Sequence, residues 1–218
     1  MTREEWLAGP PGTGKTTTLS RMIIDAVKEH GSDGVLVSSF TKAAAVELAG
    51  KGLPIDAERV GTLHSICYRA LGYPEIAESK AAEFNDEYPQ YALSGLSNKG
   101  DEPSWDYEAK TENDAYFADY QVQRTRMIPL MSMTYNGEYS QDFVDFCDAW
   151  RRWKRENDYL DFADLLERAL REIDGPPIDA SVMFVDEAQD CGPIHMALAR
   201  KWAQSMERLV LGFDDDQA

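Results

Sequence analysis

Apolar residues follow two spacings along the chain, and these spacings predict where strands and helices lie. A short apolar stretch at residues 6–8 predicts a strand, and helical spacing over residues 19–27 predicts a helix that ends at Gly31. The β-branched run 34–40 predicts a second strand, followed by an alanine-rich helix over 41–52. Residues 59–72 repeat the change from strand to helix. This alternation is typical of an α/β fold, in which helices flank a parallel sheet.

The alternation stops at residue 73, where an acidic, aromatic-rich sequence with a turn-rich cluster at 94–104 begins. The strand and helix pattern resumes after the turn at 174–179, with an apolar run over 182–185, a helical stretch over 194–206 and a last apolar run over 208–213. We therefore predict an α/β core formed by residues 1–72 and 151–218. Residues 73–150 are expected to be an inserted, mainly helical subdomain.

One helix of the second half places its apolar residues on a single face. These residues are Phe143, Phe146, Cys147, Trp150 and Trp153, whereas Arg151, Arg152, Lys154 and Arg155 fall largely on the other faces. The favoured interpretation is a packed core below a solvated basic face. The alternative is that the aromatic rings stack on the bases of a single strand, with the basic residues beside them.

Composition limits the class of protein. The chain has 218 residues, of which 43% are hydrophobic, so it can form a packed interior. No run approaches 18 apolar residues and the N-terminus lacks a signal pattern, so we expect neither a membrane protein nor a secreted one. Three isolated cysteines, Cys67, Cys147 and Cys191, indicate reduced thiols in the cytoplasm. The three histidines are equally scattered, and no metal cage is expected.

The net charge of −17 is unevenly distributed. Residues 1–72 contain 8 acidic and 8 basic residues, residues 73–150 contain 16 and 5, and residues 151–218 contain 15 and 9. Most of the negative charge therefore lies in the predicted insertion. The total has the wrong sign for a protein that grips nucleic acid by charge alone, but the neutral first segment can still bind anions locally.

The strongest motif begins at Gly9. Gly9, Gly14, Lys15 and Thr16 match the pattern G-x-x-x-x-G-K-[ST], in which backbone N–H groups surround the phosphates of a nucleotide and the lysine adds positive charge. Thr16 is then expected to bind Mg²⁺. The residues predicted to hold the nucleotide are Gly9, Pro10, Pro11, Gly12, Thr13, Gly14, Lys15, Thr16 and Thr17. The alternative, a Gly-Pro turn before a helix, does not explain four matches at fixed offsets.

Two acids complete the predicted nucleotide site. Asp186 and Glu187 end the apolar run over 182–185, where Asp186 is expected to hold Mg²⁺ through water and Glu187 to activate the water that attacks the γ-phosphate. A second carboxylate beside the metal-binding acid favours hydrolysis over phosphoryl transfer to a metabolite. The alternative is an acidic pair at the surface end of a strand.

The stretch VDEAQD resembles the second motif of the UvrD/Rep family of superfamily 1 DNA helicases. Four further stretches are similar to family motifs in the same order along the chain: SFTKAAAVEL, GTLHS, DFADLL and GFDDDQA. With the phosphate loop, six ordered matches cover nearly the whole chain except the predicted insertion. The resemblance implies a RecA-like P-loop motor domain that uses ATP and Mg²⁺.

The resemblance also assigns roles to single residues. It implies that Phe40, Thr41 and Lys42 contact single-stranded DNA, with Thr62 and His64 along the same track. The alternatives are that Phe40 packs in the core and that His64 caps a helix. Gln217 is expected to sense the γ-phosphate, and Gln189 and Asp190 to join the same coupling network. Asp161, Phe162 and Asp164 match a motif near the core, where Phe162 packs.

Two family features are missing from this sequence. No glutamine precedes Gly9 to read adenine, and the second RecA-like domain with its arginine finger is not included. We therefore expect one motor half of an ATP-dependent DNA helicase or single-stranded DNA translocase, which binds nucleotide weakly and hydrolyses it very slowly alone. The alternatives are the motor half of a helicase-nuclease of the RecB or AddA type, a non-catalytic half of a split helicase that needs a partner chain, and a decoy that binds replication proteins.

Overall fold

The computed structural model describes residues 2–9, 15–50, 52–94 and 109–214. By its contacts the chain divides into two compact units. The sheet unit comprises Met1–Ala70 and Arg168–Ala218, and the helical unit comprises Leu71–Glu167. This division groups residues 151–167 with the helical segment, because Trp153, Lys154 and Asp161 make their contacts there. The assignment of residues 73–150 as an inserted subdomain remains a prediction.

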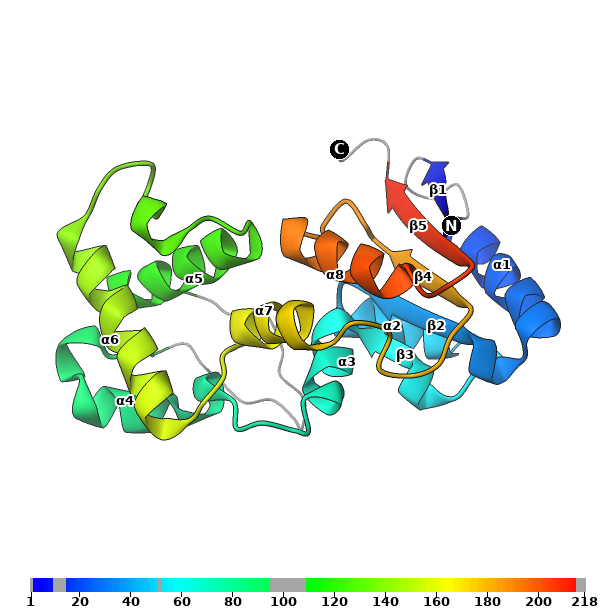
Figure 1. Cartoon of the computed structure of the whole chain (residues 1–218). Helices are drawn as coiled ribbons and strands as arrows, with labels where there is room; N and C mark the ends of the chain where they lie inside the picture. The colour runs from blue at the N-terminus through cyan, green and yellow to red at the C-terminus, as the bar shows by residue number, and fades with distance from the viewer. Residues whose placement is uncertain (1, 10–14, 51, 95–108, 215–218) are drawn as a thin grey trace. The chain divides into compact units, whose positions relative to one another are not determined.

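The described part of the sheet unit contains a five-stranded parallel sheet (Figure 1). The strands lie in the order β1-β5-β4-β2-β3. Their bounds are Arg3–Gly9 for β1, Val35–Ser39 for β2, Val60–Thr62 for β3, Val182–Asp186 for β4 and Arg208–Asp214 for β5. The predicted α/β fold is confirmed, with the all-parallel sheet of a RecA-like P-loop domain. The first strand is longer than the apolar stretch 6–8 that predicted it, because it pairs with β5 along its whole length.

Helices cover both faces of this sheet. In the sheet unit they are α1 (Lys15–His30), α2 (Lys42–Gly50), α3 (Leu63–Ala70) and α8 (Pro193–Ala203), and α7 (Phe162–Glu172) crosses the boundary between the units. Leu19 and Ile23 of α1 are fully buried with Val37, Phe184 and Val210 of three strands. Side chains alternate between the faces of a strand, so the intervening residues of β4 and β5 face the side of α8, and Figure 1 shows α1 and α8 on either side of these strands.

The helical unit is built around α4 (Ala81–Glu87), α5 (Glu112–Thr125) and α6 (Gln141–Asn157). The predicted apolar face of α6 is buried: Phe143, Phe146, Cys147, Trp150 and Trp153 are at most 3% exposed. Their rings pack edge-on against neighbours such as Phe84, whose centroid lies 5.0 Å from that of Trp150. Packing in the core is thereby confirmed, and the alternative of stacking on bases is wrong for these residues.

The predicted basic face of α6 needs one correction. Arg151, Arg152 and Arg155 are exposed as expected, but Lys154 is only 4% exposed. Lys154 lies one helical turn after Trp150, so its side chain follows the apolar face into the unit. It is buried because two carboxylates, Asp161 and Asp164, surround its ammonium group.

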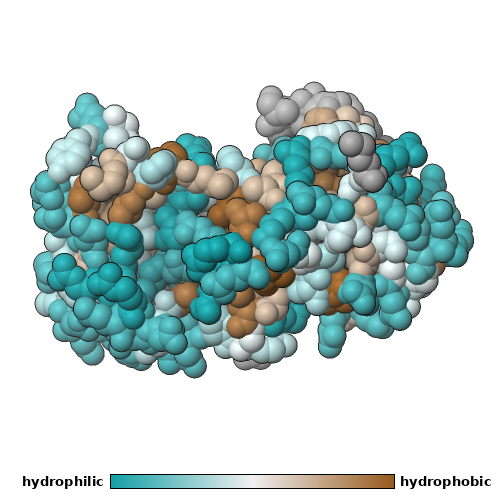
Figure 2. All heavy atoms as spheres, in the orientation of Figure 1, coloured by the Kyte–Doolittle hydropathy of each residue, from teal (hydrophilic) through white to brown (hydrophobic). Residues whose placement is uncertain are grey.

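Hydrophilic residues cover most of the visible surface of both units (Figure 2), in keeping with a charged content of 28%. The larger apolar side chains that remain exposed include Trp6 of β1, which is 54% exposed, and Met131. Among the described helices, none combines the length and the apolar character needed to cross a membrane.

Candidate functional site

The ends of the five strands define the candidate site. Because the sheet is parallel, the last residue of every strand lies at the same edge. Gly9 of β1 pairs with Asp214 of β5, and Ser39 of β2 pairs with both Asp186 of β4 and Thr62 of β3. Ligands of open α/β sheets bind outside this carboxyl edge. The fold therefore brings the start of the phosphate motif, the acidic motif and two predicted DNA-contacting segments to one edge.

The phosphate motif joins the end of β1 to the start of α1. Gly9 is the last residue of β1, and Lys15 and Thr16 open α1. Pro10, Pro11, Gly12, Thr13 and Gly14 lie outside the described residues, as do the side chains of Lys15 and Thr16, whereas Thr17 is exposed. The first turn of α1 contains no acidic residue, and its last turn contains Lys28 and His30. The start of α1 therefore suits an anion, since a helix N-terminus presents unpaired N–H groups and positive potential.

The acidic pair lies in a turn that hydrogen bonds hold in place. The Glu187 backbone N–H donates to Asp186 Oδ1 at 3.1 Å, and the Ala188 N–H donates to the carbonyl oxygen of Gly212 at 2.8 Å. A Cβ atom at Gly212 would stand 3.1 Å from Asp186 Oδ1, so glycine leaves room for this carboxylate. Glu187 has φ of 55°, a left-handed conformation that costs about 1–2 kcal/mol for a residue with a side chain. The turn thus fixes Asp186 at the edge of the sheet and holds Glu187 in a strained conformation.

The donors at this edge fit a magnesium ion that arrives with phosphate. Among the described residues, no group of three or more His, Cys, Asp or Glu side chains could hold a metal ion. Mg²⁺ usually takes only one or two carboxylates from the protein and completes its shell with water and substrate phosphates. Asp186 provides such a carboxylate at the sheet edge from which the chain passes from β1 to α1.

The remaining residues of the predicted coupling network are only partly described. Gln189 Nε2 donates to Asp190 Oδ2 at 3.2 Å, and the Asp190 N–H donates to the carbonyl oxygen of Glu187 at 3.0 Å. These bonds tie both residues to the turn that carries the acidic pair. Gln217 lies outside the described residues.

Two of the predicted DNA-contacting threonines act as helix caps. Thr41 Oγ1 accepts a hydrogen bond from the Ala44 N–H at the start of α2, and Thr62 Oγ1 accepts one from the Ser65 N–H at the start of α3, both at 3.1 Å. Such caps satisfy N–H groups that have no partner within the helix. A structural role is therefore present at both positions, and it is Thr62, not His64, that caps α3. Thr41 is exposed, and the side chain of Lys42 is not described.

Phe40 and His64 meet at a third ring, which the sequence did not indicate. His195, in the first turn of α8, packs edge-on against both: its ring centroid lies 5.9 Å from that of Phe40 and 5.2 Å from that of His64. His64 and His195 are each 5% exposed, and Phe40 is partly buried. Burial lowers the pKa of His195 to about 4, and burial followed by the nearby His195 lowers the pKa of His64 well below its ordinary value. Both imidazoles are therefore neutral at pH 7.

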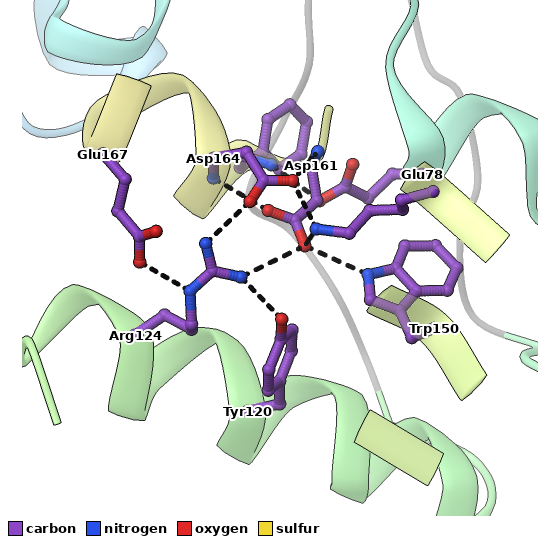
Figure 3. A network of polar contacts seen from close by, with 9 residues as sticks. Glu78, Tyr120, Arg124, Trp150, Asp161, Asp164 and Glu167 are labelled. Carbon is purple, nitrogen blue, oxygen red and sulfur yellow. Dashed lines mark hydrogen bonds and ion pairs between the residues drawn. The ribbon is translucent and has the colours of Figure 1, made fainter. Parts of the chain in front are cut away.

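The motif at Asp161 forms a second polar site, inside the helical unit (Figure 3). Asp161 Oδ1 accepts from the Asp164 N–H at 2.8 Å, and Asp164 Oδ2 accepts from the Asp161 N–H at 3.0 Å, so the two acids cap the start of α7 reciprocally. Phe162 is buried, and its N–H donates to Glu78 Oε1 at 3.0 Å. The expectation that Phe162 packs is confirmed.

Two cations, one buried and one partly buried, hold these acids. Lys154 binds both Asp161 and Asp164. Arg124 of α5 donates to Asp164 Oδ1 at 2.7 Å, to Glu167 Oε1 at 2.6 Å and to the Tyr120 hydroxyl at 2.6 Å. The Trp150 indole N–H adds a bond of 3.0 Å to Asp161 Oδ2. Two features of the sequence point to this network, the motif at Asp161 and the spacing of four residues that places Lys154 on the same face as Trp150. No feature of the sequence points to Arg124.

The acids of this network have different proton affinities. Burial alone would raise the pKa of Asp161, but the ammonium of Lys154 and the guanidinium of Arg124 hold it below the usual range. Burial and the charge of Asp161 raise the pKa of Asp164, and the same two causes raise the pKa of Glu78 well above its ordinary value of 4.5. The two cations therefore balance Asp161 and Asp164, while Glu78 is the acid that is most readily protonated.

Comparison with known proteins adds one finding. The family model described as UvrD/REP helicase N-terminal domain matches residues 2–218. None of the curated proteins compared with the chain matches it.

Proposed function

The chain belongs to the UvrD/REP helicase N-terminal domain family, and from this premise we propose that it is the ATP-binding half of a DNA motor. In this proposal the chain couples the hydrolysis of ATP, with Mg²⁺, to movement along single-stranded DNA, and a second RecA-like domain completes the ATP site. The membership itself supports a helicase motor. The nucleotide, the metal ion, the DNA strand and the second domain are parts of the proposal.

One observation carries the proposal: the order of the strand ends along the carboxyl edge. The edge runs from Gly9 of β1 through β5 to Asp186 of β4, and then to Ser39 of β2 and Thr62 of β3. Neighbouring strands lie about 4.8 Å apart, so the phosphate motif and Asp186 are separated by only ~10 Å, and Asp186 and Thr62 by a similar distance. The predicted nucleotide and DNA segments are thus adjacent halves of one edge, which supports direct coupling between them.

The roles of the residues follow from their positions. The backbone at the start of α1 and the Lys15 side chain would bind the phosphates, and Thr16 and Asp186 would hold the magnesium ion. When bound, Mg²⁺ neutralises the charge on the β- and γ-phosphate oxygens. Glu187 would orient a water molecule for attack and accept its proton, while the hydrogen-bonded turn keeps its backbone fixed. Phe40 and Thr41, directly after β2, would contact the DNA.

A binding and turnover experiment tests the proposal. We expect the chain to bind a fluorescent Mg-nucleotide weakly, to bind labelled oligo(dT) in a salt-dependent manner, and to hydrolyse ATP very slowly with or without DNA. Glu187→Gln should abolish the residual turnover and leave nucleotide binding intact, whereas Lys15→Ala should weaken binding. Failure to bind nucleotide would overturn the proposal, and rapid turnover stimulated by DNA would show that no second domain is needed.

A further inference from the structure

The ring of His195 belongs to an element that connects the predicted nucleotide segments and the predicted DNA segments of the candidate site. His195 lies in the first turn of α8, and α8 begins three residues after Asp190, where the turn that carries Asp186 and Glu187 ends. The ring contacts Phe40, which follows β2, and His64, in the first turn of α3. One side chain therefore joins the element after the acidic turn to two predicted DNA-contacting residues.

The chemistry of this ring argues against an ordinary core role. His195 is 5% exposed, and among the described residues its ring nitrogens make no hydrogen bond to another side chain. Burying a polar ring whose nitrogens are poorly satisfied is costly, and an apolar ring of similar size would fill the same space without that cost. The ring is also neutral, so it does not attract phosphate by charge.

What the ring contributes is shape. Edge-on pairs with centroids between 4.5 and 7 Å are favourable beyond the area that they bury, and His195 makes two of them at once. Each pair restricts the rotation of its partner ring. If α8 shifts with the acidic turn, the rings of Phe40 and His64 must shift with it, because both rest on His195.

We propose that His195 is a positioning residue that sets the rings of Phe40 and His64 for single-stranded DNA and links their position to the nucleotide-binding turn. This inference rests on the proposed function, since it presupposes that DNA binds at Phe40 and His64. It adds a residue that the motifs do not include, and it assigns the coupling to a contact between rings.

The test compares variants of His195 by equilibrium binding. His195→Ala removes both ring contacts, and His195→Phe keeps a ring but removes the nitrogens. Affinity for labelled oligo(dT) is measured with and without Mg-nucleotide, and affinity for fluorescent Mg-nucleotide is measured with and without oligo(dT). Linkage requires the two coupling factors to be equal, which provides an internal check.

We expect His195→Ala to weaken oligo(dT) binding about 5- to 20-fold and to bring the coupling factor close to 1, with nucleotide affinity in the absence of DNA unchanged. His195→Phe should keep DNA affinity and coupling within about two-fold of the original chain, because shape is retained. The matched control is Leu198→Ala, one turn further along α8 and fully buried, which should lower stability without changing the DNA affinity of the folded protein.

Three results would overturn the inference while leaving the proposed function intact, provided that the original chain binds both ligands. They are unchanged DNA binding and coupling in His195→Ala, equal losses in His195→Phe and His195→Ala, and a loss in Leu198→Ala as large as that in His195→Ala. If the original chain fails to bind oligo(dT), the DNA part of the proposed function fails, and the inference fails with it.

Discussion

Replacing Lys154 by methionine removes one of the two cations that face Asp161 and Asp164, and the expected cost is large. The Lys154 side chain is 5% exposed, and its ammonium group binds both acids. Methionine fills a similar volume, so the change isolates the charge from the packing. Arg124 would remain as the single cation beside the two carboxylates, at 2.7 Å from Asp164 and 3.8 Å from Asp161.

The magnitude follows from the proton that the variant must take up. A carboxylate that loses its partner escapes its charge by protonation, and of the two acids that Lys154 binds Asp164 is the candidate, because its pKa is already raised in the folded chain. Protonating a group with an ordinary pKa of 3.8 costs about 1.4 kcal/mol for each pH unit above that value, or about 4 kcal/mol at pH 7. Breaking a buried ion pair from one side typically costs about 3–5 kcal/mol, so the two arguments agree.

The sign of the pH dependence is a sharper test. In the variant the folded state holds a proton that the unfolded state releases above pH 3.8, so the penalty must shrink as the pH falls toward that value. We expect it to decrease from about 4 kcal/mol at pH 7 to about 2 kcal/mol at pH 5. Urea unfolding followed by tryptophan fluorescence measures both values, because Trp150 and Trp153 lie in the same core.

Arg155→Met is the matched control, since Arg155 is the next residue of α6 and is exposed. It should change the free energy of unfolding by less than about 0.5 kcal/mol. The reasoning is refuted if Lys154→Met costs less than about 1 kcal/mol at pH 7, or if its penalty is the same at pH 5.

Three further predictions concern other described residues. Above pH 4.5 the original chain loses stability, because the Glu78 carboxyl releases its proton in the unfolded state before it does so in the folded state. Glu78→Gln should remove this loss, so the free energy of unfolding of the variant, measured in urea, should exceed that of the original chain by up to ~3 kcal/mol at pH 7 and equal it at pH 4. Burial raises the pKa of Cys147 and Cys191 to about 12 and raises that of Cys67 further, so at pH 8 a thiol-reactive dye should label the folded chain at least ~10-fold more slowly than the chain in urea, and equal rates would contradict this. A Cβ atom at Gly61 would lie 2.5 Å from Ser65 Oγ, so Gly61→Ala should cost about 1–3 kcal/mol in thermal unfolding, and adding Ser65→Ala should recover most of this loss if the clash is its cause.

The sequence predicted those parts of the protein that local pattern determines. The strand and helix alternation, the end of α1 before Gly31 and the apolar face of α6 depend on spacing along one segment, and all three are found in the structure. Two polar features escaped because they depend on partners far along the chain. Lys154 looks like a surface base until Asp161 and Asp164 fold back on it, and Arg124 meets Glu167 across 43 positions.

The same distinction applies to the candidate site. Motif spacing identified Asp186, Glu187 and the threonines after β2 and β3, but it could not show that Thr41 and Thr62 cap helices. His195 carries no motif, and its contacts with Phe40 and His64 arise only when three separate strand-to-helix junctions converge. The roles of these residues toward nucleotide and DNA remain predictions.

The pairing of β1 with β5 determines the order in which the protein can fold during its synthesis. The strand that leads into the phosphate motif, Arg3–Gly9, pairs in the described structure with Arg208–Asp214. One edge of β2 pairs with the nearby β3, but its other edge pairs with Val182–Asp186. The helical unit, by contrast, is one continuous stretch whose contacts can close as soon as it leaves the ribosome. The first strands of the nascent chain therefore carry unpaired edges until some two hundred residues have been made, a period in which chaperones would protect them from aggregation.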